Sequence, residues 1–179
     1  LYALTSGAGN VAIGYQALLE HTAQDDNTVL GYQAAFNTND SHCAQNVFIG
    51  KLSGGGSWGG TARYNTAVGF ESMIGALNGS EHNTMIGYRA GDGLTSGQYN
   101  TGIGSGVTFD IDANNQTALG YGATTDSAND IAVGNTSVDE VKGQVDFSTF
   151  SDKRIKKDII DGDLGLDFTG NIQDEHFTK

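Results

Sequence analysis

Residues 65–87 read NTAVGFESMIGALNGSEHNTMIG, and this stretch contains one five-residue phrase twice, at 65–69 and at 83–87. The phrase is a polar residue, two small or variable residues, an aliphatic residue and glycine. It occurs eight times, at 10–14, 27–31, 46–50, 65–69, 83–87, 100–104, 116–120 and 130–134. The closing glycines lie 17, 19, 19, 18, 17, 16 and 14 residues apart. Such a period indicates a stack of similar units rather than one globular core.

Within each unit, the residues before the glycine favour a short strand, and the glycine permits a sharp bend. A second short segment follows, such as YQA at 15–17 and YRAG at 88–91, and we expect a second strand there. The remainder of the unit is polar and turn-like. A helix is excluded because glycine recurs inside every candidate helix. We therefore predict an all-β fold in which about eight coils stack and equivalent strands hydrogen-bond to one another.

Stacking in register would turn each phrase position into a ladder along the axis. The polar position predicts a polar ladder or a repeated turn of Asn10, Asn27, Asn46, Asn65, Asn83 and Asn100. The aliphatic position predicts one apolar ladder of Ile13, Leu30, Ile49, Val68, Ile86, Ile103, Leu119 and Val133. The bends fall on Gly14, Gly31, Gly50, Gly69, Gly87, Gly104, Gly120 and Gly134.

A single roll of this kind would be thin and would leave an apolar face uncovered. We expect self-association along the long axis to cover it, and a trimer would bury the face against two further copies. The pattern requires burial of this kind and does not by itself give the number three.

Composition narrows the function classes. The formal charge is −12, which disfavours nucleic acid and anionic membrane surfaces as partners. No run approaches the ~18 apolar residues of a transmembrane helix. The chain starts at Leu1, and we expect it to be part of a longer protein. The chain has one cysteine, Cys43, so an internal disulfide is excluded. We expect its thiol to be buried or incidental.

No cofactor or metal is expected. The four histidines lack zinc-like spacing. The acidic pairs at 25–26 and 110–112 do not follow the EF-hand spacing, and we interpret them as solvated turns. The glycine-rich segment 53–60 lacks the residues of a phosphate loop, and we expect it to loop outward. Trp58, Arg63 and Tyr64 lie on this longest excursion and are candidate receptor or glycan contacts, with packing between chains as the alternative.

The late units, TALGYGATTDSANDIAVGNTS at 117–137, resemble the head repeats of trimeric autotransporter adhesins. Earlier units such as NTAVGFES and NTMIGYRAG are similar to longer repeats of phage tail fibres. The resemblance covers roughly residues 8–138 and implies a left-handed parallel β-roll in each chain of a homotrimer.

The segment SDKRIKKDI at 151–159 resembles the opening of the endosialidase-type intramolecular chaperone domain of phage fibres. That domain helps three chains assemble and then cuts itself off. The resemblance places the nucleophile at Ser151 and the base at Lys156, with cleavage after Phe150. The family's domain is much longer than residues 151–179, so this segment is truncated or degenerate. Read alone, the segment favours a charged helix start capped by Ser151, and it is the repeats before it that favour the chaperone resemblance.

These patterns predict a β-roll rod over 1–137, a β connector over 138–150 and a partial chaperone segment over 151–179. The predicted function is the structural and adhesive segment of a trimeric phage tail fibre, outside the cell on the virion. Its partners would be further copies of itself and a host cell-surface glycan or protein receptor. It would be no enzyme apart from the self-cleavage. The alternatives are a bacterial surface adhesin of the trimeric autotransporter type and a fibre-borne enzyme that degrades polysaccharide.

Overall fold

The computed structural model describes residues 6–20, 23–37, 43–58, 60–75 and 78–142. These residues contain strands and turns and no helix, which confirms the all-β prediction. The strands are β1 Val11–Ile13, β2 Thr28–Leu30, β3 Cys43–Ala44, β4 Val47–Ile49, β5 Ala62–Arg63, β6 Thr66–Val68, β7 Thr84–Ile86, β8 Thr101–Ile103, β9 Thr117–Leu119 and β10 Ile131–Val133.

The chain divides into two units, Leu1–Asp139 and Glu140–Lys179. All ten strands lie in the first unit. In the second unit, the described residues include an ion pair between Lys142 Nζ and Glu140 Oε2 at 2.8 Å. The predicted chaperone segment, with Ser151 and Lys156, lies outside the described residues.

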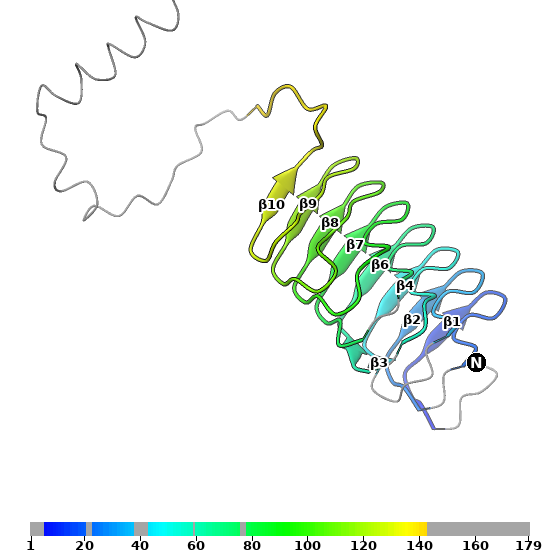
Figure 1. Cartoon of the computed structure of the whole chain (residues 1–179). Coiled ribbons are helices and arrows are strands. Elements are labelled where there is room, and N and C mark those ends of the chain that lie inside the picture. The colour runs from blue at the N-terminus through cyan, green and yellow to red at the C-terminus, as the bar shows by residue number, and fades with distance from the viewer. Residues whose placement is uncertain (1–5, 21–22, 38–42, 59, 76–77, 143–179) are drawn as a thin grey trace, which may run out of the picture. The chain divides into compact units, whose positions relative to one another are not determined.

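The main sheet is parallel and has the order β1-β2-β4-β6-β7-β8-β9-β10 (Figure 1). Its register pairs each phrase with the same position of the next, for example Val68 with Ile86 and Ile86 with Ile103. The first unit is therefore a β-solenoid of about seven turns, close to the predicted eight coils. The eight main strands follow from the eight phrases of the sequence.

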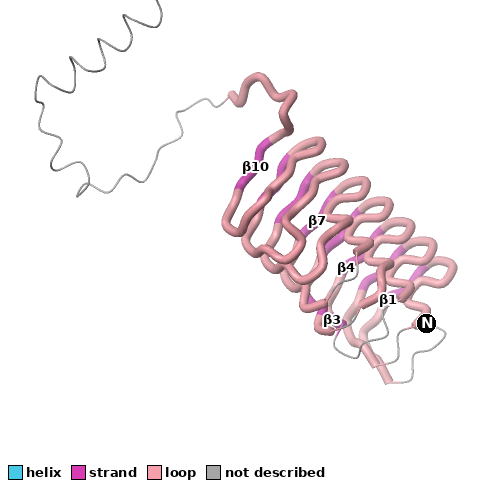
Figure 2. Tube along the Cα trace, in the orientation of Figure 1, coloured by secondary structure: helices cyan, strands magenta, loops and turns pink. Residues whose placement is uncertain are grey.

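The main strands form one side of each coil, and turns form most of the rest (Figure 2). A small second sheet pairs β3 with β5 in parallel. Isolated parallel bridges join Arg63 to Glu81 and Thr108 to Thr124. In the described part of the chain, the side of the coil away from the main strands thus carries much less regular pairing.

The predicted second strand after each glycine is wrong, because the segments at 15–17 and 88–91 form turns. Gln16 and Leu18 have φ of 55° and 51°, in the left-handed region that strands do not use. These turns still stack, since Gln33 N–H donates to the Tyr15 carbonyl at 2.8 Å. The chain therefore rounds a corner here while keeping its hydrogen bonds to the next coil.

The interior is filled by the middle residue of each main strand, because side chains alternate across a strand. Val29, Phe48, Ala67, Met85 and Ala118 are fully buried at this position. Apolar side chains from the turns meet them from the other side of the coil, including Leu18, Met73, Leu94 and Val107.

The segment 53–58 packs into the coil, so the prediction of an outward loop is wrong. Ser53, Gly54 and Trp58 are buried there. A Cβ at Gly54 would lie 2.7 Å from the Phe48 ring, which a side chain could not tolerate. The Phe48 and Trp58 rings meet edge to face, with centroids 5.1 Å apart. The missing side chain at Gly54 thus makes room for the aromatic pair.

The glycine that closes each phrase is required by the stacking itself. Gly69 has φ of 140°, a conformation that residues with a Cβ rarely adopt. A Cβ at Gly69 would also collide with the carbonyl oxygen of Gly87 in the next coil. The recurrence of glycine therefore reflects close backbone approach between successive coils.

Candidate interaction surfaces

A buried ladder of asparagine side chains runs through the solenoid, as predicted for the polar position. Asn65 is typical: its Nδ2 donates to Asn46 Oδ1 at 3.1 Å and to the Ser80 carbonyl at 2.8 Å. Its Oδ1 accepts from the backbone N–H and the Nδ2 of Asn83, both at 3.1 Å. Gln116 continues the ladder by donating its N–H to Asn100 Oδ1 at 2.8 Å. These bonds fix the register of successive coils.

The outward positions of the main strands form a second feature, which we call the aliphatic face. The predicted apolar ladder is present, since the residues of this position pair rung by rung. On the single chain, Ile13 is 59% and Ile103 45% accessible, whereas Ile49, Val68 and Leu119 are half-buried. A parallel row of Val, Thr and Ile side chains lies beside it at the first strand position. None of the residues of the eight main strands is charged.

The position after each glycine forms a third row, which we call the aromatic ladder. After the first seven glycines it consists of Tyr15, Tyr32, Lys51, Phe70, Tyr88, Ser105 and Tyr121, and after Gly134 the position holds Asn135. Tyr15 stacks on Tyr32 with centroids 5.3 Å apart, and Phe70 stacks on Tyr88 at 5.5 Å. Lys51 Nζ lies 5.6 Å from the Tyr32 centroid and 5.5 Å from that of Phe70. A cation thus occupies the rung between these two rings, at cation–π distance from both.

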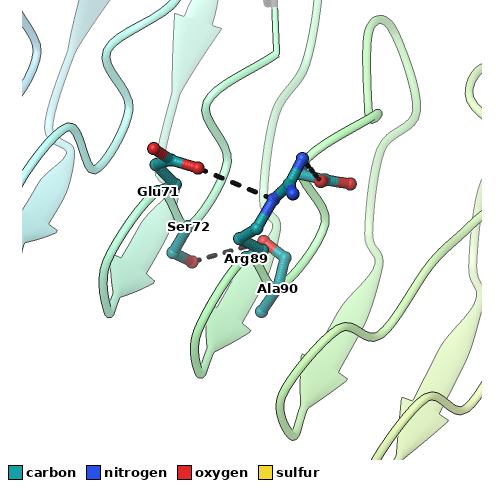
Figure 3. A network of polar contacts seen from close by, with 5 residues as sticks. Glu71, Ser72, Arg89 and Ala90 are labelled. Carbon is teal, nitrogen blue, oxygen red and sulfur yellow. Dashed lines mark hydrogen bonds and ion pairs between the residues drawn. The ribbon is translucent and has the colours of Figure 1, made fainter.

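Arg89, next to Tyr88, is held by two carboxylates (Figure 3). Its Nη2 lies 2.8 Å from Asp92 Oδ2, and its Nε lies 3.6 Å from Glu71 Oε2 on the preceding coil. The Asp92 carboxylate is the main cause that raises the pKa of Arg89 above its ordinary value. Below it, Ser72 Oγ donates to the Ala90 carbonyl at 3.3 Å. The guanidinium is therefore fixed beside the aromatic ladder.

A separate aromatic stack lies at the corner that precedes the asparagine ladder. Tyr64 stacks on His82 with centroids 4.6 Å apart, and His82 stacks on Tyr99 at 5.0 Å. All three have φ between 58° and 60°. Tyr64 was predicted from the sequence as a contact residue, whereas His82 and Tyr99 were not. The available signal was their common place directly before the asparagine in three successive repeats.

The three candidate receptor contacts do not share a surface. Trp58 is only 2% accessible, so the expected exposure of its indole is wrong. Tyr64 is 47% accessible and belongs to the stack just described. Arg63 is half-buried in β5. The exposed aromatic residues are instead arranged in the two rows along the axis.

The acidic turns accept hydrogen bonds from the preceding coil. Asp112 accepts from Thr95 Oγ1 and Ser96 Oγ, both at 2.7 Å, and these donors lower its pKa. Asp25 accepts from the Ala8 N–H at 2.7 Å. Among the described residues, no group of three or more His, Cys, Asp or Glu side chains could hold a metal ion.

Cys43 is buried, as expected. Within the described ranges, no helix is long and apolar enough to cross a membrane. Compared with protein-family models and with curated proteins, the sequence matches none of them.

Proposed function

We propose that this chain is the structural and adhesive segment of a trimeric fibre of the phage-tail type, which attaches to a host cell surface. The observation that carries this proposal is the aliphatic face. It is uncharged, it combines an aliphatic ladder with a row rich in threonine, and it is exposed or half-buried along the axis from β1 to β10. Contiguous apolar surfaces of this kind mark interaction sites.

Another copy of this chain fits the face better than an unrelated partner. The rungs recur at the strand spacing of about 4.8 Å, and a second copy in parallel register presents the same spacing. The chain carries a formal charge of −12, so copies repel elsewhere on their surfaces. An uncharged face directs association to one side of each copy. Three copies would bury each face against two others and would form a left-handed roll in each chain, as the family resemblance implies.

The adhesive part of the proposal is supported by the two aromatic rows, which present the same contact repeatedly along the axis. Three chains would multiply these contacts, and multivalency can raise a weak affinity about 10²-fold or more. The assignment to phage fibres is supported by the resemblance of residues 117–137 and 151–159 to parts of such fibres.

The test is to place charge on the aliphatic face. In the double variant Ile86→Lys and Ile103→Lys, both side chains are already accessible in one chain, so each chain should fold. Lysines meeting around the axis should repel and should shift the sedimenting species from three chains to one. Ile111→Lys is the matched control, because Ile111 is equally exposed but lies outside the main strands. The proposal fails if the double variant sediments like the control.

A further inference from the structure

At Ser105 the aromatic ladder has neither a ring nor a long side chain, and a hollow lies at this rung. Ser105 stands between Tyr88 and Tyr121, at a position where the five preceding coils carry a ring or the Lys51 cation. Both tyrosines line the hollow, together with Arg89, Asp92, Ser105, Gly106 and Thr108, and its volume is about 390 Å³. Tyr121 is 75% accessible, so one wall of the hollow is open to solvent.

The spacing of the walls suits an inserted ring. Two rungs of a parallel sheet separate equivalent residues by roughly 10 Å. A flat group placed midway would therefore lie about 5 Å from each ring centroid, within the normal stacking range. The chain itself shows such an arrangement, since Lys51 lies 5.6 Å and 5.5 Å from the rings on either side of it. At Ser105 the side chain is too short to fill the same space.

The remaining lining offers hydrogen bonds rather than an unpaired charge. Ser105 and Thr108 contribute hydroxyl groups, and Thr108 Oγ1 lies 2.9 Å from Thr124 Oγ1. Asp92 is the one carboxylate among the lining residues, and its Oδ2 pairs with Arg89. A cation would thus find no uncompensated carboxylate. Aromatic walls beside hydroxyls and a fixed ion pair match a sugar ring, which has apolar C–H faces and a rim of hydroxyl groups.

We propose that the hollow between Tyr88 and Tyr121 is a saccharide-binding site for a pyranose whose substituents are all equatorial. Such a ring presents only axial hydrogens on both faces, so both faces can stack on a tyrosine. A sugar with an axial hydroxyl would push that group against one wall. The site rests on the proposed attachment to a cell surface, and it names the chemical class of the receptor. The hollow lies at the end of the strands, beside the aliphatic face rather than on it.

The test uses the full chain and cellotetraose, a β-linked glucose tetramer, observed by saturation-transfer NMR and by titration calorimetry. Ser105→Tyr should fill the hollow and reduce cellotetraose binding at least about tenfold, the loss expected when ring stacking is blocked. This variant should fold, because tyrosine occupies the same position at Tyr15, Tyr32, Tyr88 and Tyr121. Lys51→Tyr is the matched control, which fills a different rung and should leave binding unchanged. Tyr121→Ala removes one wall and should also weaken binding.

Three outcomes would overturn the site: no binding of cellotetraose to the natural chain, equal binding to the Ser105→Tyr variant, or binding of tetralysine alone. Equal binding of a β-linked galactose tetramer, which has an axial hydroxyl, would overturn the stated sugar specificity. Sedimentation of the same samples separates this inference from the proposed function. A natural chain that binds cellotetraose as a monomer would keep the site and contradict the trimer, whereas a trimer without sugar binding would do the reverse.

Discussion

The inward and outward sides of each main strand differ in how far a single chain buries their side chains. In β7, Met85 points inward and is fully buried, whereas its neighbour Ile86 points outward and is 40% accessible. Inside, polar groups are paired as well: among the described residues, Trp58 Nε1 and Thr125 Oγ1 are the buried side-chain atoms that lack a hydrogen-bond partner. One chain therefore satisfies its own interior and leaves an uncharged exterior face accessible, which the proposed assembly would cover. Substitutions inside should cost folding stability, and substitutions on the outer face should cost association.

The largest expected effect comes from breaking the buried polar ladder with Asn65→Asp. The variant loses both side-chain donors and places a carboxylate opposite Asn46 Oδ1 and the Ser80 carbonyl. An uncompensated buried charge costs about 3–5 kcal/mol, measured as the loss in free energy of unfolding in urea. Asn114→Asp is the control, because exposed Asn114 uses only its oxygen, which accepts from Gln98 N–H at 2.7 Å. A loss below about 1 kcal/mol for Asn65→Asp would contradict the structural role of the ladder.

Trp58→Ala tests whether the glycine-rich segment belongs to the core. The indole is buried against Phe48, and truncation of a buried Trp costs about 3 kcal/mol or more. Trp58→Phe should cost much less, because it keeps a ring and removes the unpartnered Nε1. Tryptophan fluorescence of the natural chain gives an independent reading: a buried indole should resist quenching by iodide. Ready quenching together with a neutral Trp58→Ala would place this residue outside the core.

On the exterior, Lys51→Met tests the cation in the aromatic ladder. The substitution keeps a similar length and removes the charge that lies between Tyr32 and Phe70. Exposed cation–π contacts contribute about 0.5–1 kcal/mol each, so the expected loss in unfolding free energy is about 1 kcal/mol. Thermal unfolding measures the stability of both Lys51→Met and Lys51→Ala. The difference between the two variants separates the contribution of the charge from that of side-chain packing. An unchanged stability would mean that the lysine is stacked without contributing energy.

The smallest expected effect concerns Asp112, on an exposed turn. Because its pKa is lowered by the hydroxyls of Ser96 and Thr95, the ionised form stabilises the folded chain. This contribution is present above the unfolded pKa near 3.8 and disappears as the pH falls through the lower folded value. The natural chain and the Asp112→Asn variant should therefore differ slightly in melting temperature at neutral pH. In acid their melting temperatures should become equal. Asp126→Asn, another exposed aspartate, is the control. A difference that persists in acid would assign the effect to something other than ionisation.

Much of the fold follows from the sequence because the repeat is in register with itself. The phrase position of Asn65 specifies the buried polar ladder, and that of Val68 specifies the outward aliphatic ladder. The position of Gly69 specifies the close backbone approach between coils. In a stack, equivalent positions of successive repeats lie next to one another. The repeat pattern in the sequence therefore also predicts which residues are in contact between coils. The ladders and the parallel register were therefore predictable.

Contacts that depend on one coil only were not predictable. In the sequence, Gly54 is typical of a flexible loop. In the structure it lies against the Phe48 ring, and its lack of a side chain makes room for the pair of Phe48 and Trp58. Likewise, the segment after Gly14 has strand-like composition, but Gln16 adopts a left-handed conformation that ends the strand. The hollow at Ser105 arises because this position carries a short side chain between two tyrosines. It can be recognised only after the neighbouring coils have been placed in register.

Sedimentation equilibrium of the natural chain over a wide concentration range tests the central claim most directly. If the exposed aliphatic face is covered by further copies, the mass should be three times the 18.7 kDa of one chain. A species of 18.7 kDa at every concentration would contradict the claim that this face is an interface between copies.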